Sequence, residues 1–85
     1  AVAGRTAIAG SAVLEEGVLI GGYCAVLGHL TIGRGSQIHA SSTVTKSCLA
    51  GSILRGVPAR DYRLYLREEA MLRRMARTDA EDAAQ

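Results

Sequence analysis

The sequence predicts a mainly β protein, a left-handed parallel β-helix of about three coils followed by an α-helix. An aliphatic residue recurs at every sixth position in the first half, and an Arg-rich segment with helical spacing follows the single proline. A period of six fits neither an α-helix nor an ordinary strand. The aliphatic series consists of Val2, Ile8, Leu14, Ile20, Val26, Ile32, Ile38 and Val44, and Ala50 continues it weakly.

Each six-residue unit is expected to form a short strand and a turn, with its aliphatic side chain pointing into a triangular prism. Three units close a coil, and each coil stacks on the next. The residue four positions after the aliphatic is often small, as it is at Thr6, Ala12, Val18, Cys24, Ser36, Ser42 and Cys48. We therefore expect a β-helix over residues 1–56, truncated on its N-terminal side because the first repeat begins at residue 1.

An exit loop and an α-helix are expected over residues 57–78. Pro58 cannot donate to a strand ladder, so it ends the last coil. Asp61 is a suitable N-cap for a helix that runs to about Arg77. The terminal residues 79–85 contain no apolar anchor, and we expect them to be disordered. The apolar positions of the helix share one stripe, formed by Leu64, Tyr65, Met71, Leu72 and Met75.

The amino-acid composition limits which partners the protein is expected to bind: nucleic acid, a membrane or another protein chain. The formal net charge of +2 is too small to indicate nucleic-acid binding, although residues 60–77 carry six Arg against three acids. The longest uncharged apolar stretch, residues 18–30, is interrupted by glycines and is shorter than the roughly 20 residues of a membrane span. We expect no transmembrane span and no signal peptide. An 85-residue domain also buries a modest fraction of its surface, so a partner chain is expected.

Several segments resemble one family of hexapeptide-repeat acyltransferases, the UDP-3-O-(3-hydroxyacyl)glucosamine N-acyltransferases of lipid A biosynthesis. GHLTIG within the stretch at 19–33, VTKS at 44–47 and the long Arg-rich helix together are the more specific signals. Sugar acetyltransferases of the same fold share AGS and GVPAR. The matching segments are AVAG at 1–4, IAGS at 8–11, LIGGYCAVLGHLTIG at 19–33, VTKS at 44–47, AGSILRGVPAR at 50–60 and DYRLYLREEAMLRRM after it.

The resemblance implies a cytoplasmic homotrimer with each active site in a cleft between two subunits. There an acyl group moves from the phosphopantetheine arm of acyl carrier protein to the 2-amine of a UDP-linked acylglucosamine. No permanently bound cofactor and no metal are implied. The family's general base matches a position before Ala1, so the 85-residue chain alone is expected to be inactive or nearly so.

The resemblance also assigns roles to residues in this chain. Gly10 matches the glycine whose backbone N–H holds the oxyanion. His29 matches an accessory histidine that helps to place the substrate or the acyl chain. Thr43 and Thr45 match positions that line the acyl groove. The cations expected to bind the acidic carrier protein are Lys46, Arg60, Arg63 and Arg67.

Simpler interpretations remain open at this stage. His29 can be an outward corner residue, Gly10 a turn glycine, and the basic helix face merely solvated. His39 is expected to be solvated, and a zinc site built from it and His29 would need a third ligand. The enzymatic alternative is an acetyl-CoA-dependent sugar acetyltransferase of the same fold. The non-enzymatic alternative is a β-helix that serves only to trimerise.

Overall fold

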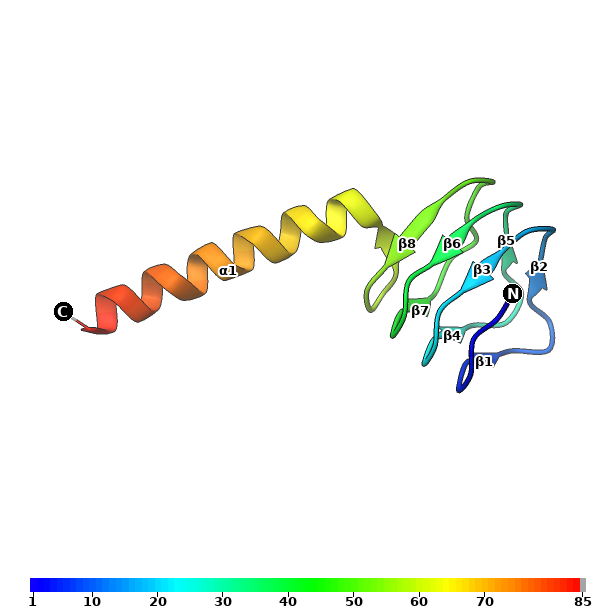
Figure 1. Ribbon diagram of the computed structural model, residues 1–85, viewed down its shortest axis with the longest axis horizontal. Coiled ribbons are helices and arrows are strands. Elements are labelled where there is room, and N and C mark those ends of the chain that lie inside the picture. Colours follow the sequence, from blue (N-terminus) through cyan, green and yellow to red (C-terminus); the bar gives the residue numbers. More distant parts are fainter. Residues whose placement is uncertain (85) are drawn as a thin grey trace.

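A three-sided tube of short parallel strands carries one long helix at its end (Figure 1). The computed structural model describes residues 1–84, with side chains up to residue 79. The strands are β1 (Ala7–Ile8), β2 (Val13–Leu14), β3 (Leu19–Ile20), β4 (Ala25–Val26), β5 (Thr31–Ile32), β6 (Gln37–Ile38), β7 (Thr43–Val44), β8 (Ile53–Arg55) and β9 (Arg60–Asp61), and the helix is α1 (Tyr62–Ala84).

Strands of successive coils stack in register and form the three faces of the tube. One face contains β1, β4 and β7, a second β2 and β5, and a third β3, β6 and β8. On the first face Ile8, Val26 and Val44 lie above one another, and on the third Ile20 lies above Ile38. All of these pairings are parallel, so the predicted fold class is confirmed.

The core is the narrow interior of the tube. Both sequence series face inward, because the aliphatics and the small residues four positions later are the buried side chains of the coils. Each fully buried Val or Ile contributes roughly 1.5–3 kcal/mol before entropy. Val2 is 46% exposed because no described coil stacks above it. The buried side chains are those of Val18, Ile20, Cys24, Val26, Ile32, Ser36, Ile38, Ser42 and Val44.

The third coil is shorter than the two before it, and here the predicted series was wrong. Cys48, not Ala50, pairs with Ile32, and Leu54 then pairs with Ile38. If the spacing between coils had stayed at 18 residues, Ala50 would pair with Ile32 and Gly56 would pair with Ile38. The shift is favoured because it packs Leu54 against the core. The shortening falls in the turn at residues 45–47, which replaces residues 27–31 of the coil before.

The exit loop is tied to the last coil by hydrogen bonds. Gly56 N–H donates to the buried Ser42 Oγ at 3.1 Å, and Ala59 N–H donates to the Thr43 carbonyl at 2.7 Å. β9 then pairs antiparallel with β8. The predicted N-cap is confirmed, because Asp61 Oδ2 accepts from the N–H groups of Arg63 at 3.0 Å and Leu64 at 3.4 Å.

The helix is longer than predicted. It continues past Arg77 and reaches Ala84, so the predicted disordered tail is helical over residues 79–84, whereas Gln85 lies outside the described residues. No Gly or Pro follows Pro58, and Ala is a strong helix former, so nothing in the sequence stops the helix near residue 77. Within the described residues, no helix has the apolar length that crossing a membrane requires.

Candidate active site

Three predicted site residues lie along one corner of the tube, between the β1–β4–β7 face and the β2–β5 face. Gly10 belongs to the corner of the first coil, His29 to that of the second, and Lys46 to that of the third. Parallel stacking brings these turns above one another although they are far apart in sequence. We call this row of turns, residues 9–12, 27–30 and 45–47, the His29 corner.

His29, in the second coil, is exposed, and its backbone is held by the first coil. Its φ of 62° is uncommon for a residue other than glycine, although His is among the residue types that tolerate it. Its N–H donates to Ser11 Oγ at 3.0 Å. Gly28 allows this approach, because a Cβ there would lie 2.7 Å from Ser11 Oγ. Sequence reasoning missed Ser11, whose only signal is its position 18 residues before His29.

Gly10 presents an open backbone amide at the same corner. A Cβ at Gly10 would meet nothing within 4 Å, and within the described part of the chain its N–H has no hydrogen-bond partner. The N–H of Gly28, in the second coil, is equally unengaged among the described residues. Two amides without a hydrogen-bond partner among the described residues therefore belong to the same corner as His29. Donors of this kind can hold a carbonyl oxygen as negative charge develops on it.

Of the two predicted acyl-groove residues, Thr43 lies on the neighbouring face and Thr45 lies in the His29 corner itself. Thr43 is half-buried, and its outward side continues a row of small residues through Ala25 and Ala7. The exit loop covers its edge, since Thr43 N–H donates to the Gly56 carbonyl at 3.0 Å. Thr45 is exposed in the shortened turn. The face beside the His29 corner thus carries a row of small uncharged side chains, Ala7, Ala25 and Thr43.

The four predicted carrier-binding cations are not equivalent. Arg60 Nε contacts Glu68 Oε1 at 3.0 Å, and its Nη1 donates to the Pro58 carbonyl at 2.8 Å. Arg63 and Arg67 are exposed on α1. Lys46 is exposed at the His29 corner. Arg60 thus anchors the helix to the exit loop, whereas the other three cations face solvent.

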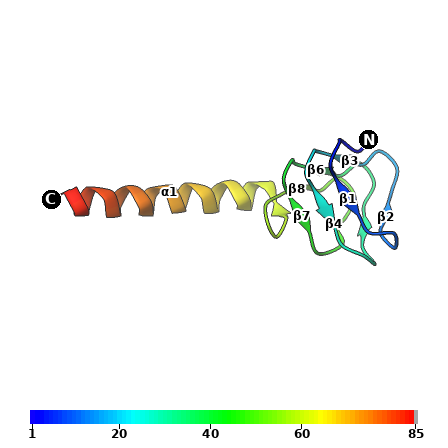
Figure 2. The same ribbon diagram turned by 90° about the horizontal axis from the view of Figure 1, so that it is seen from below.

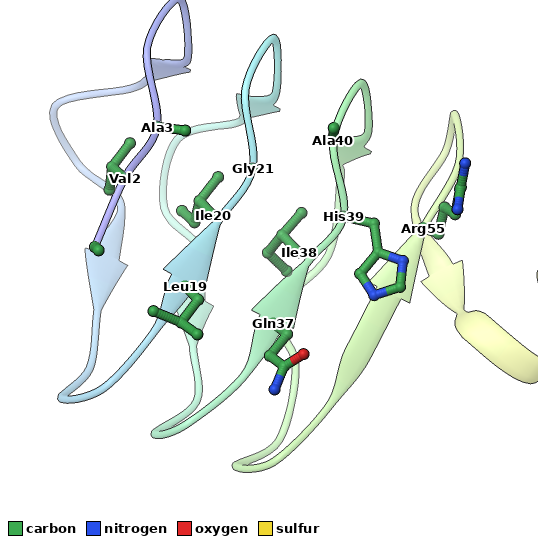
Figure 3. A pocket seen from close by; sticks show the side chains of 11 residues that line it. Val2, Ala3, Leu19, Ile20, Gly21, Gln37, Ile38, His39, Ala40 and Arg55 are labelled. Atoms are coloured by element: carbon green, nitrogen blue, oxygen red, sulfur yellow. The ribbon is translucent and has the colours of Figure 1, made fainter.

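A groove that the sequence did not predict crosses the β3–β6–β8 face (Figure 3). Small residues such as Ala3 and Gly21 border it, and His39 and Arg55 lie side by side at its end nearest the helix. His39 was expected to be solvated, but its ring is half-buried against Tyr62, with ring centroids 4.6 Å apart. The aromatic start of α1 covers it.

The groove and the His29 corner are on different parts of the tube. The groove lining includes neither Gly10 nor His29 nor Thr45. The corner is an outer edge of the three-sided tube, where Gly10, His29 and Thr45 are exposed. The two histidines do not come together, and among the described residues no three His, Cys, Asp or Glu side chains gather as metal ligands would.

The sequence was compared with models of protein families and with the sequences of known proteins, and both comparisons point to acyl-transferring enzymes. Residues 11–46 match the model of the bacterial transferase hexapeptide family, described as six repeats. Over 78 residues, 92% of this chain, the sequence is 44% identical to a UDP-3-O-acylglucosamine N-acyltransferase of Methylorubrum extorquens. The chain spans 22% of that relative's length.

Two crystal structures have a similar fold. Serine acetyltransferase from Brucella abortus strain S19 superposes with a TM-score of 0.60 at 34% identity, over 68% of this chain and 25% of that one. AntD, an N-acyltransferase from Bacillus cereus in complex with dTDP and 3-hydroxybutyryl-CoA, gives 0.59 at 27% identity, over 76% and 37%. Both proteins are acyl-transferring enzymes by name.

Proposed function

Residues 11–46 carry the bacterial transferase hexapeptide repeat, and from this premise we propose that the chain is the C-terminal part of an N-acyltransferase of lipid A biosynthesis. The enzyme moves a 3-hydroxyacyl group from acyl carrier protein to the 2-amine of a UDP-3-O-acylglucosamine in the cytoplasm. One observation carries the proposal. The similarity to a UDP-3-O-acylglucosamine N-acyltransferase extends over 92% of the chain, so it includes both the repeats and most of the exit helix.

The proposed chemistry takes place at the His29 corner. As the amine attacks the thioester carbon, the carbonyl oxygen becomes negative and the Gly10 N–H donates to it. The C–N bond then persists while the C–S bond breaks, and the phosphopantetheine leaves as its thiol. One such donor contributes typically about 2.7–4 kcal/mol to the transition state. His29 lies in the next coil and orients the substrate or the acyl chain. We assign the general base that takes the amine proton to the part of the enzyme outside these 85 residues, since the chain spans 22% of the relative's length.

In a homotrimer, a neighbouring subunit covers the exposed His29 corner and completes the site. The acyl chain lies along the small-chained face with Thr43 and Thr45. The donor is the phosphopantetheine arm of the carrier, so the protein needs no permanently bound cofactor and no metal. Lys46, Arg63 and Arg67 bind the acidic carrier surface, with Arg60 holding the helix in place.

Carrier binding tests this proposal. The affinity for 3-hydroxyacyl-loaded acyl carrier protein should fall as salt rises from low to physiological concentration, because exposed cations contact an acidic surface. The double variant Arg63→Ala/Arg67→Ala should weaken binding roughly tenfold, since each exposed pair contributes up to about 1 kcal/mol. Arg34→Ala is the matched control, an exposed Arg on the tube that pairs with Glu16 at 3.8 Å.

The same assay distinguishes the alternatives. Tight binding of acetyl-CoA or 3-hydroxyacyl-CoA, with no binding of the loaded carrier, would favour a CoA-dependent acyltransferase. AntD, crystallised with 3-hydroxybutyryl-CoA, makes that the second candidate. Assembled oligomers that bind neither donor nor a UDP-sugar would instead favour a β-helix whose role is only to trimerise.

A further inference from the structure

The groove on the β3–β6–β8 face ends at a pair of basic side chains beside the start of α1. The three strands lie side by side on this face, and the helix leaves the tube beyond β8 (Figures 1 and 2). The groove has a volume of about 560 Å³, which is a size at which protein pockets hold small molecules. None of the residues of the His29 corner lines it.

Small side chains keep the groove open along the tube. One row of outward positions passes from Ala3 through Gly21 to His39 and Arg55, so it is small in the first two coils and basic after them (Figure 3). A Cβ at Gly21 would lie 2.7 Å from a backbone nitrogen of the next coil. Leu19, which is 50% exposed, adds an apolar wall. The row covers three steps between stacked strands, about 14 Å.

Arg55 is a half-buried cation without a counter-charge. It lies opposite Arg60 in the β8–β9 ladder, and like charges directly opposite one another are destabilising. The two guanidinium carbons are 5.1 and 5.2 Å from the ring centroid of Tyr65. Glu68 pairs with Arg60, whereas Arg55 has no carboxylate partner among the described residues. An anion beside Arg55 would relieve this repulsion, and His39 next to it offers a further hydrogen-bond donor.

We propose that this groove binds an aliphatic carboxylate, with the head group on Arg55 and His39 and the alkyl chain along Ala3, Gly21 and Leu19. A guanidinium matches a carboxylate with two parallel hydrogen bonds. The mostly apolar lining disfavours a ligand that is charged along its whole length, such as an acidic peptide, and a neutral chain would leave Arg55 unmatched. The inference does not depend on the proposed acyl transfer, because its residues lie outside the His29 corner.

Proton NMR of the full 85-residue chain tests the site directly. The chain contains two histidines, so the imidazole resonances of His39 and His29 report on the groove and on the corner separately. Decanoate, added at constant pH and below the concentration at which it forms micelles, should shift the His39 resonances and leave those of His29 in place. Decanol lacks the charge and acetate lacks the chain, so each should bind at least about tenfold more weakly.

Substitutions at the two ends of the groove test the orientation of the ligand. Arg55→Gln should weaken decanoate binding roughly tenfold, because it removes a charge-assisted contact. Arg34→Gln is its control, an exposed Arg on the tube that pairs with Glu16. Ala3→Leu should fill the groove and also weaken binding roughly tenfold, whereas Ala76→Leu, at an exposed position of α1, should not.

Thermal unfolding checks that each variant is folded. If Arg55→Gln does not fold, Arg55→Lys replaces it. That variant keeps the charge but loses the two parallel hydrogen bonds, so it should weaken decanoate binding by about threefold.

Each remaining outcome would reject the inference. Decanoate that shifts His29 and not His39 would place the chain at the His29 corner. Equal affinities for decanoate and decanol would remove the role of Arg55, and an equal affinity for inorganic phosphate would indicate an anion site without a place for an alkyl chain. An absence of decanoate binding would also overturn it. Loss of carrier binding with decanoate still at His39 would overturn the proposed function alone.

Discussion

The backbone N–H of His29 donates to the hydroxyl oxygen of Ser11 at 3.0 Å, so one coil fixes the corner of the next. The two residues are 18 positions apart, one full turn of the tube. His29 also has a φ of 62°, which a turn without support would rarely adopt. Ser11 is thus a positioning residue for the histidine that we place in the site, although it touches no substrate itself.

Removing the Ser11 hydroxyl should loosen this corner. We expect Ser11→Ala to lower the free energy of unfolding by about 1 kcal/mol, because it removes one hydrogen bond at an exposed position. Ser47→Ala is the matched control, since Ser47 Oγ accepts from Thr31 N–H at 2.9 Å but does not touch His29. Urea denaturation should give similar losses for both variants.

Catalysis should distinguish these two serine variants. In the complete enzyme, Ser11→Ala should raise KM or lower kcat, whereas Ser47→Ala should leave both near the parent values. Equal kinetic effects would argue against a special role for the Ser11–His29 contact.

A second prediction concerns Gly33, where the corner of the third coil passes close by. A Cβ at Gly33 would lie 2.8 Å from the Ala50 Cα and would also overlap other backbone atoms of that corner. Backbone cannot move aside as a flexible side chain can, so Gly33→Ala should cost about 1–3 kcal/mol of unfolding free energy. Gly4→Ala is the control, with nothing within 4 Å of its added Cβ. Thermal unfolding that ranks Gly4→Ala below Gly33→Ala would contradict the prediction.

The fold was predictable because its signal is repeated. An aliphatic at every sixth residue places one side chain per unit on the tube axis, and the N-cap at Asp61 follows from local chemistry. The shortened third coil was not predictable from spacing alone. Cys48 and Ala50 are both small, and the choice between them depends on whether Leu54 reaches the core, which is a tertiary effect.

The candidate site was only partly predictable. The alignment of Gly10, His29 and Lys46 at one corner follows from the period of 18, once three units are known to form a coil. The groove on the β3–β6–β8 face depends on the shortened coil, because only a spacing of 16 puts Arg55 beside His39. The packing of Tyr62 on His39 depends on the direction in which α1 leaves the tube.

The start of α1 offers a third prediction. Asp61→Ala removes the oxygen that accepts from the N–H groups of Arg63 and Leu64, and should cost about 1 kcal/mol. Asp61→Asn keeps an acceptor in the same place and should cost much less. Far-ultraviolet circular dichroism during thermal unfolding measures both variants. If Asn were as damaging as Ala, the carboxylate charge rather than the capping bond would be the source of stability.

The last prediction distinguishes an arginine that holds α1 to the exit loop from the arginines that we propose bind the carrier protein. Arg60 contacts Glu68, the Pro58 carbonyl and the ring of Tyr65, with its guanidinium carbon 5.2 Å from the ring centroid. Its side chain is only 26% exposed, so these contacts are partly shielded from water. Arg60→Ala should therefore lower the free energy of unfolding by about 1–2 kcal/mol.

Arg63→Ala is the matched control for that substitution. The Arg63 side chain is exposed and has no partner among the described residues, so its loss should change the free energy of unfolding by less than about 0.5 kcal/mol. Carrier affinity should show the reverse order. At a temperature where both variants are folded, Arg63→Ala should bind the carrier more weakly than Arg60→Ala does. We therefore assign stability to Arg60 and carrier binding to Arg63. If one of the two variants lost more than the other in both unfolding free energy and carrier affinity, this assignment would be wrong.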